Sequence, residues 1–202
     1  MTSLADIAAQ AASCTRCDLY ERASGTVFGE GPSHARLVLV GEQPGDVEDK
    51  EGHVFVGPAG RILHRALEDT GIRRKDAYLT NAVKHFKWQP RGKRRIHQRA
   101  NGTEIMACRV WLEAELAVIS PRVTVAMGVV AGIGVFGTGF RVRDHRGRVE
   151  EADVGEWHGQ VVSTIHPSAV LRAPDSAARD ESYAGFIADL RLARDTAGLA
   201  AP

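Results

Sequence analysis

Four short apolar runs occur along the chain, and each is followed directly by small or polar residues. They are residues 36–41 (RLVLVG), 77–83 (AYLTNAV), 122–127 (RVTVAM) and 160–165 (QVVSTI). Continuous apolar runs of this length are typical of strands that are buried on both faces. The pattern therefore predicts four strands of a parallel sheet.

Three longer segments place apolar residues at helical spacing instead. They cover residues 58–70, 103–119 and 176–193. The first opens with Pro58, a residue favoured in the first turn of a helix. The second opens with Thr103 and Glu104, which form an imperfect capping box because Met106 holds the third position after Thr103.

The order of these elements predicts an α/β fold. We expect one domain over residues 1–202, with a central, mainly parallel, four-stranded sheet flanked by helices on both faces. Two stretches between the third and fourth strands carry no predicted element. They are the glycine-rich segment 128–139 and the charged segment 144–151.

Composition fits one soluble domain and leaves its partner open. The chain has 202 residues, 44% of them hydrophobic, which is enough for a sizeable core. Lysine and arginine total 26 and aspartate and glutamate 25, so overall charge does not indicate a nucleic-acid partner. No apolar run is long enough to span a bilayer, and MTSLADIAAQ lacks the features of a signal peptide. We expect a cytoplasmic protein with no membrane contact.

One local segment departs from this balance of charge. The run PRGKRRIHQR lies in a predicted loop at about residues 89–100 and places His97 among arginines and a lysine. Such a run is usually a solvated surface turn. It is also the obvious place for a local basic footprint on nucleic acid.

The cysteines indicate metal binding. Cys14 and Cys17 form a CxxC motif, and Cys108 is the third cysteine of the chain. A structural disulfide is not expected in a reducing cytosol, and the motif precedes any strand, unlike a thioredoxin-type pair. Thiolate sites for zinc or an iron–sulfur cluster generally need four ligands, so one position is left for a histidine.

Residues just after the predicted strands are rich in functional groups. GEQPGD (41–46), NAVKH (81–85) and HPSAVLR (166–172) follow three of the four strands. The first matches neither a dinucleotide fingerprint nor a phosphate-binding P-loop, but offers carboxylates and an amide. Because ligands of parallel sheets bind beyond the carboxyl ends of strands, we predict an active site at this edge.

These motifs resemble a known family. GEQPGDVEDKEGHVFVGPAGRIL, TNAVKH, HPS, the CxxC motif and MACRVWLEAEL are similar to the uracil-DNA glycosylase superfamily, close to its iron–sulfur family 4 branch. Family 4 usually has alanine in place of Gln43 and cysteine in place of His85, and lacks the KRRIH segment. All three differences are typical of the UdgX group, whose members attach covalently to the DNA site from which they remove uracil.

The resemblance implies a 4Fe-4S cluster with a structural role. Its ligands would be Cys14, Cys17, His85 and Cys108, so that His85 fills the position left by the cysteines. Zinc, or three cysteines with an exogenous ligand, remain alternatives because thiolates suit both metals.

The resemblance also implies uracil-containing DNA as the substrate, with the nucleotide flipped out or already single-stranded. Phe55 corresponds to the residue on which uracil stacks, and Asn81 to the amide that reads its edge. Alternatively, Phe55 is a core residue and Asn81 caps the end of its strand. Asn81 can donate to a carbonyl oxygen and accept from a ring N–H, which suits uracil and opposes cytosine. The predicted substrate loop also contains Gly41, Gln43 and Asp46, and Asp46 is alternatively a cap or a supporting residue.

The implied chemistry involves three residues. His166 would hydrogen-bond the uracil oxygen on which negative charge develops. Glu42 would orient a water molecule towards the cationic sugar carbon in an ordinary glycosylase. In the UdgX group the imidazole of His97 captures that carbon in place of water, with Glu42 or Gln43 orienting the ring or accepting its proton.

The basic run would then bring His97 to DNA. The predicted DNA contacts are Lys93, Arg94, Arg95, Ser168 and Arg172. Contacts to phosphates position a protein without reading sequence. We also expect the neighbouring cations of the run to lower the pKa of His97 by like-charge repulsion, which keeps the ring neutral for attack.

We therefore predict a DNA repair protein that excises uracil, preferentially from single-stranded DNA, and stays covalently linked to the abasic site through His97 in a single turnover. We expect it to act as a monomer on the bacterial nucleoid. One alternative is a conventional multiple-turnover uracil-DNA glycosylase in which His97 only contacts DNA. Another is a non-catalytic iron–sulfur module that binds single-stranded DNA.

Overall fold

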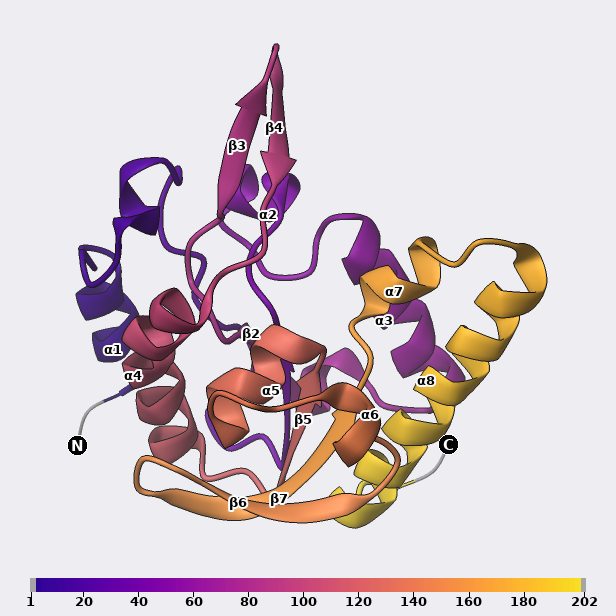
Figure 1. The fold of residues 1–202 in the computed structure, drawn as a ribbon. Coiled ribbons are helices and arrows are strands. Elements are labelled where there is room, and N and C mark those ends of the chain that lie inside the picture. The colour runs from indigo at the N-terminus through magenta and orange to yellow at the C-terminus, as the bar shows by residue number, and fades with distance from the viewer. Residues whose placement is uncertain (1–2, 201–202) are drawn as a thin grey trace.

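The computed structural model describes residues 3–200, which form a central sheet between two layers of helices (Figure 1). The sheet has five strands in the order β2-β1-β5-β7-β6. They are β1 (Leu37–Gly41), β2 (Ala77–Asn81), β5 (Val123–Met127), β6 (Val149–Val154) and β7 (Trp157–Thr164). The first four neighbours in this order run parallel, which confirms the four predicted strands and the mainly parallel sheet.

The fifth strand, β6, pairs antiparallel with β7 at the edge of the sheet and was not predicted. It begins inside the charged segment and buries only Ala152 and Val154 among its six residues. An edge strand needs to bury only part of one face, so its sequence lacks the continuous apolar run of the central strands.

Helices cover both faces of the sheet (Figure 1). They are α1 (Leu4–Ala11), α2 (Asp46–Glu51), α3 (Pro58–Asp69), α4 (Gly102–Ile119), α5 (Val129–Phe136), α6 (Val142–His145), α7 (Pro167–Leu171) and α8 (Ser176–Ala197), with 3-10 turns η1 (Asp18–Glu21) and η2 (Arg74–Asp76). The three predicted helices are present as α3, α4 and α8, and α8 extends four residues beyond its predicted end at residue 193.

Side-chain alternation along β1 divides the core between the two faces. Val38 and Val40 pack with residues of α4 and α5. Leu37 and Leu39 pack with residues of α3 and α8. Burying a side chain of this size stabilises the fold by roughly 1.5–3 kcal/mol relative to leaving it exposed. β1, β2 and β5 are buried at every position because both faces are covered.

Two local predictions about helices were wrong. Asn101, not Thr103, caps α4: its Oδ1 accepts a hydrogen bond from the Glu104 N–H, and the Glu104 carboxylate accepts one from the Asn101 N–H. Helix α5 occupies the glycine-rich segment because its glycines permit close packing. A Cβ at Gly132 would lie 2.0 Å from the Phe140 ring. Tertiary contact here outweighs the poor helix propensity of glycine.

The predicted basic loop is a β-hairpin instead. Strands β3 (Trp88–Arg91) and β4 (Arg94–His97) pair antiparallel, with Trp88 opposite His97. Gly92 opens the two-residue connection with a φ of 59°, a position at which hairpin turns favour glycine. The hairpin projects beyond the carboxyl ends of the parallel strands, next to α2 (Figure 1).

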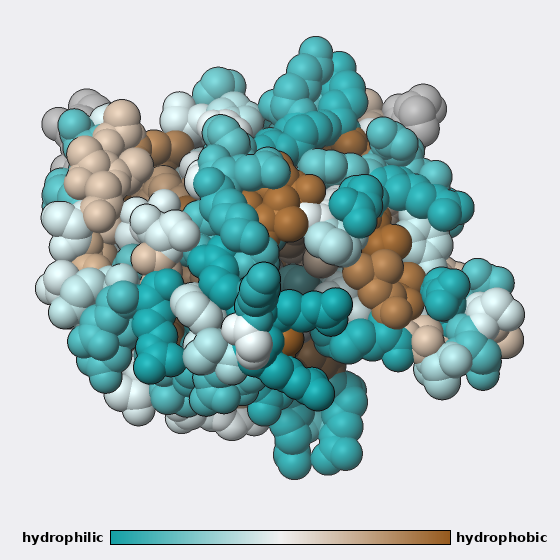
Figure 2. Space-filling model, turned by 90° about the horizontal axis from the view of Figure 1, so that it is seen from above, coloured by the Kyte–Doolittle hydropathy of each residue, from teal (hydrophilic) through white to brown (hydrophobic). Residues whose placement is uncertain are grey.

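Seen from the side of the hairpin, the surface is mostly hydrophilic, with a few hydrophobic patches around a central hollow (Figure 2). In the described part of the chain, no helix combines the length and apolar character that crossing a membrane requires.

Candidate active site

The carboxyl ends of β1 and β2 bring three predicted substrate residues together. Gly41 and Asn81 end these strands and are paired in register. A Cβ at Gly41 would lie 2.3 Å from Asn81 Oδ1 and 2.5 Å from Phe55 Cζ. The amide of Asn81 and the ring of Phe55 therefore meet over the Cα of Gly41, where only glycine fits. This arrangement provides an aromatic face and a hydrogen-bonding amide at one point.

Phe55 is buried in the core cluster that contains Val54 and Leu63, as the alternative of a core residue predicted, but its backbone conformation is unusual for a core residue. Its φ is 56°, in the left-handed region that bulky residues rarely adopt. Gly60, in α3, makes this possible because any Cβ there would lie 1.8 Å from the Phe55 carbonyl oxygen. Strained residues of this kind cluster at ligand sites, where the surrounding structure holds them in place.

The carboxyl group of Glu42 lies at the N-terminus of α5. Burial raises its pKa, while hydrogen bonds from the backbone N–H groups of Val130 and Val129 and the charge of Arg172 favour its ionised form. The carboxylate also touches Gly128, where a Cβ would lie 2.5 Å from Glu42 Oε1. Glu42 is thus held as a partly buried carboxyl group at the edge of the sheet.

Gly128 is a site residue that the sequence prediction missed. It follows β5 with a φ of 91°, and a Cβ there would collide with Glu42 and lie 2.8 Å from the Cβ of His166. The only signal in the sequence was its position directly after the third strand, next to the other motif-bearing strand ends. Its lack of a side chain lets Glu42 and His166 approach each other.

The ring of His166 is oriented by its own helix. His166 caps α7, and its Nδ1 accepts hydrogen bonds from the Ser168 hydroxyl at 2.8 Å and the Ser168 N–H at 3.2 Å. Arg172 donates to the same hydroxyl at 2.8 Å. Burial, followed by the charges of Arg172 and His97, lowers the pKa of His166 to about 3. A neutral ring whose Nδ1 accepts must carry its proton on Nε2, which makes Nε2–H a donor.

Ser168 takes a different part from the one predicted, whereas the predicted DNA contact of Arg172 stays a prediction. The Ser168 hydroxyl is engaged between His166 and Arg172, so it supports the ring instead of standing free for a phosphate. Arg172 is exposed, and only one of its N–H groups is bonded to Ser168. Through the Ser168 hydroxyl, Arg172 connects the ring of His166 to the protein surface.

Gln43 fastens the base of the hairpin. Its Oε1 accepts a hydrogen bond from the Ala100 N–H at 2.9 Å, and its Nε2 donates to the Gln98 carbonyl at 3.0 Å and the Lys87 carbonyl at 3.4 Å. One buried amide thus binds the chain on both sides of β3 and β4. Gln43 was predicted as a residue of the substrate loop. Its side chain also holds the hairpin directly.

Arg95 points inward, contrary to the predicted phosphate contact. Its guanidinium binds Asp46 and Asp49, the latter at 2.6 Å, and its side chain is 18% exposed. It also lies over the rings of Phe86 and Trp88, at 5.3 and 5.5 Å from their centroids. Lys93 and Arg94 remain exposed near the tip.

Arg95 points inward while Arg94 stays exposed because side chains alternate along a strand, which turns these two residues to opposite faces of the hairpin. Asp46 starts α2, and its hydrogen bond to Lys50, followed by its bond to Arg95, lowers its pKa. Asp46 therefore supports the hairpin, in agreement with the alternative of a supporting role.

His97 ends β4 beside the other site residues. Its ring centroid lies 6.0 Å from that of Phe86, and its charge influences His166. His97 is an exposed residue at the end of β4, and partial desolvation of its ring, followed by the charge of Arg172, lowers its pKa. The direction is the one predicted, but the cause is not the basic run. Lys93 and Arg94 of the hairpin tip are exposed to solvent, which screens their charge.

The cysteines gather on the other side of the hairpin. Cys14 and Cys108 are buried, and Cys17 packs against the same core cluster. Burial, with a smaller contribution from the nearby thiols of Cys17 and Cys14, raises the pKa of Cys108 to about 11 against the lowering effect of Lys84. The Sγ of Cys108 accepts a hydrogen bond from the Lys84 N–H at 3.2 Å, directly before the buried His85.

These residues fit a polynuclear cluster by their chemistry. Like Cys108, Cys14 accepts an N–H···S hydrogen bond: Trp111 Nε1 donates to its Sγ at 3.2 Å. Within residues 3–200, no three histidine, cysteine, aspartate or glutamate side chains are close enough to hold one metal ion. The ligands of a four-iron cluster each bind a different iron, so they lie further apart than the ligands of one zinc ion.

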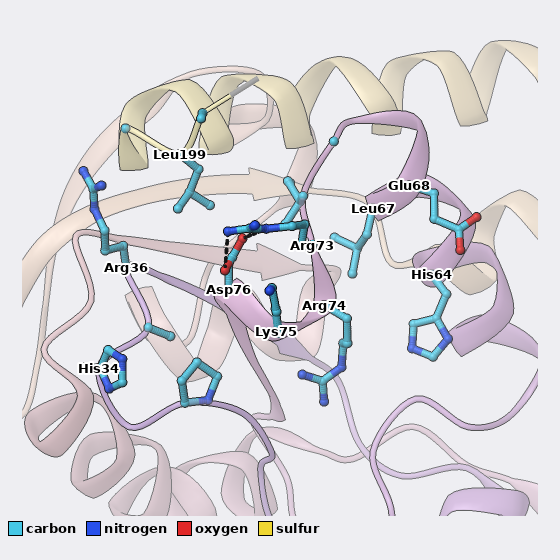
Figure 3. Close-up of a pocket in the computed structure, with 16 residues that line it drawn as sticks. His34, Arg36, His64, Leu67, Glu68, Arg73, Arg74, Lys75, Asp76 and Leu199 are labelled. Atoms are coloured by element: carbon cyan, nitrogen blue, oxygen red, sulfur yellow. Dashed lines mark hydrogen bonds and ion pairs between the residues drawn. The ribbon is translucent and has the colours of Figure 1, made fainter. Parts of the chain in front are cut away.

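A cavity of about 1090 Å³ lies elsewhere. It is formed by α3, η2, the segment before β1 and the C-terminal end of the described chain, with the Arg73–Asp76 ion pair inside it (Figure 3). None of the predicted site residues lines it. The chemistry of the carboxyl edge, not cavity size, identifies the candidate site.

Comparisons with known proteins show the family of the chain. The profile of the uracil DNA glycosylase superfamily matches residues 28–191. The type-4 uracil-DNA glycosylase of Thermotoga maritima is 39% identical over 161 residues, which cover 79% of this chain and 78% of that protein. The type-4 uracil-DNA glycosylase of Archaeoglobus fulgidus is 35% identical over 181 residues, covering 86% of each chain. By its matched profile, its relatives and its fold, the chain belongs to the uracil DNA glycosylase superfamily.

Proposed function

We propose that this protein excises uracil from DNA and then captures the deoxyribose of the abasic site through His97, in a single turnover. The observation that carries this proposal is the support of the hairpin by Gln43 and by the Arg95–Asp46–Asp49 group. It holds His97 within electrostatic reach of His166, which meets Glu42 over Gly128. A histidine that only touched DNA would not need a buried amide and two carboxylates to fix its strand.

Base recognition follows from the residues over Gly41. The ring of Phe55 offers a stacking surface, and the Asn81 amide donates to a uracil carbonyl and accepts from its N–H. A cytosine edge presents the opposite pattern, which leaves the buried amide unpaired. Nε2–H of His166 donates to the uracil oxygen that gains negative charge as the base leaves.

The reaction itself breaks the bond between the sugar carbon and the uracil nitrogen, and the electron pair leaves with uracil. The lone pair of an unprotonated nitrogen of His97 then forms a bond to the cationic carbon. The second nitrogen of the ring loses its proton to Glu42 or to water. An imidazole is a poor leaving group, so the protein stays on the DNA.

A conventional glycosylase is the second candidate, since the partly buried carboxyl group of Glu42 is suited to orienting water and the matched relatives are named type-4 uracil-DNA glycosylases. Incubation with an oligonucleotide that carries one uracil, followed by a denaturing gel, distinguishes the two. Capture gives a DNA band shifted by the mass of the protein. Turnover gives free DNA with an abasic site and more uracil released than protein present.

We propose that single-stranded DNA is preferred and that the protein acts as a monomer on the bacterial nucleoid. An unpaired uracil enters the site without the few kcal/mol that flipping from a duplex requires. The exposed Lys93 and Arg94 would contact phosphates at the tip of the hairpin. The same gel assay with matched single-stranded and duplex DNA measures the preference.

Replacing Gln43 by alanine is expected to slow capture by roughly tenfold or more, while uracil release falls less. The variant loses the three hydrogen bonds that hold both ends of the hairpin, and misplacement of a reacting group by about 1 Å can cost 10²-fold. Single-turnover rates of cross-linking and of uracil release, measured on one sample, give the comparison. Equal losses of both rates would contradict a role in positioning His97; Gln89→Ala, exposed on the hairpin, is the control.

We further propose that Cys14, Cys17, His85 and Cys108 hold a 4Fe-4S cluster, which would tie the N-terminal segment to α4 and to the end of β2. The purified protein is expected to contain iron and acid-labile sulfide and to absorb visible light. A Cys108→Ala variant should lose the iron and the sulfide. A His64→Ala variant, changed at an exposed histidine of α3, should keep them. Zinc without sulfide would contradict the cluster.

A further inference from the structure

One ion pair is buried completely near the base subsite. Lys84 and Glu115 have no exposed side-chain surface, and Lys84 Nζ lies 2.6 Å from Glu115 Oε2. The ammonium also donates to Thr80 Oγ1 at 2.6 Å and to the Asn81 carbonyl at 2.8 Å. All three protons of the ammonium are therefore used, one of them on the residue that reads the base.

Glu115 fixes the pair to its surroundings. Its Oε1 accepts hydrogen bonds from the Tyr78 hydroxyl at 2.9 Å and from the Gly29 N–H at 3.2 Å. A Cβ at Gly29 would lie 2.6 Å from the same oxygen, so the backbone approaches the carboxylate closely. The pair thus joins α4 to β2 and to the segment before β1.

Stability alone does not account for a pair of this kind. Removing two charges from water costs free energy that their attraction only partly returns, and apolar residues of similar size are often as stable or more so. What a fully hydrogen-bonded pair does supply is a defined position for its partners. The groups that it touches indicate which position matters.

Those groups belong to the short segment that ends β2. The N–H of Lys84 binds Cys108 Sγ, and its ammonium binds the carbonyl of Asn81. The intervening N–H groups of Ala82 and Val83 donate to the carbonyls of Gly41 and Glu42. The peptide that follows Asn81 is therefore held on one side by β1 and on the other by the buried ammonium.

We propose that the buried Lys84–Glu115 pair is a positioning device for Asn81, which fixes the amide that reads uracil relative to α4 and Cys108. The inference rests on the proposed function, because Asn81 must read a base for its position to matter. Lys84 and Glu115 reach neither the base nor the sugar; they act through the Asn81 carbonyl and through Thr80.

The test uses the Lys84→Met/Glu115→Gln double variant, which removes both charges and keeps an acceptor for Tyr78. It is expected to fold and to bind uracil-free single-stranded DNA like the wild type, but to release uracil at least tenfold more slowly at saturating DNA. Arg146→Met/Asp189→Asn, which neutralises the pair that ties α8 to the segment before β6, is the matched control. Its rate of release should stay within about twofold of wild type, a change that corresponds to about 0.4 kcal/mol.

An Asn81→Ala background separates positioning from general damage. If the pair acts through Asn81, the double variant should cause no further loss there, whereas independent effects would multiply. Multiplied losses, or a double variant as fast as wild type, would overturn the inference. Should the double variant not fold, Thr80→Val removes the hydroxyl shared by both charges, and the same cycle with Asn81→Ala decides. Absence of uracil release by the wild type would instead refute the proposed function.

Discussion

A His97→Ser variant, mixed with a single-stranded oligonucleotide that carries one uracil, is expected to leave no protein on the DNA after denaturation. The wild type should give a shifted band whose yield approaches one DNA per protein. Serine lacks the imidazole nitrogen whose lone pair forms the bond, and an un-ionised hydroxyl is a weak nucleophile. The expected effect is complete loss of the covalent product.

The same variant should still release uracil. Phe55, Asn81 and His166 come from other elements and do not depend on the imidazole of His97. Water can then reach the sugar carbon with Glu42 as the orienting carboxylate. A His64→Ser variant, altered at an exposed histidine of α3 outside the site, should cross-link like the wild type. A shifted band that persists in His97→Ser would assign the bond to another residue.

A Glu42→Gln variant is expected to lower the rate of uracil excision by roughly 10²- to 10⁴-fold, the range typical of a lost acid–base or charge-stabilising group. The amide keeps the size of the carboxyl group but neither stabilises the cationic sugar nor accepts a proton. Single-turnover release of uracil measures the effect. Glu51→Gln, on the exposed end of α2, is the control and should leave the rate unchanged. A rate within threefold of wild type would remove Glu42 from the reaction.

The pH dependence of the rate of uracil excision is expected to report the ionisation of Glu42. Burial raises its pKa, so the rate should fall on acidification at a higher pH than an ordinary carboxylate would give, because the active form is ionised. The pKa of His97 is lowered, so its ring stays neutral at pH values where a free imidazole is already charged. The acid limb of wild-type excision should therefore disappear in Glu42→Gln. A limb that is unchanged in this variant would assign it to another group.

The central strands were predictable because both of their faces are buried, which requires continuous apolar runs. Strand β6 and helix α5 were not. The first buries only Ala152 and Val154, and the second is held together by close contacts of Gly132 and Gly134 with Phe140 and Ala82. These residues become neighbours only after folding, so no local sequence pattern predicts their contacts.

Much of the candidate site was predictable for a geometric reason. Glu42, Asn81 and His166 follow different strands, and parallel strands bring their carboxyl ends to one edge. The direction of Arg95 was not predictable in this way. Whether a cation in a basic run faces phosphates or carboxylates depends on the register of a hairpin, and here that register turns Arg95 towards Asp46 and Asp49.

The sequence by itself determined the parallel sheet, the edge at which the functional groups gather, and the kinds of side chain present there. These follow from the period of apolar residues and from the order of motifs, both of which are local. Only the tertiary structure decided how closely the groups approach, since Gly41 and Gly128 act by lacking a side chain. It also decided that Gln43 binds the hairpin 57 residues away and that Lys84 finds Glu115 31 residues away. Such pairings depend on the packing of whole elements, because hydrogen bonds and ion pairs act over a few ångströms that only the folded chain defines.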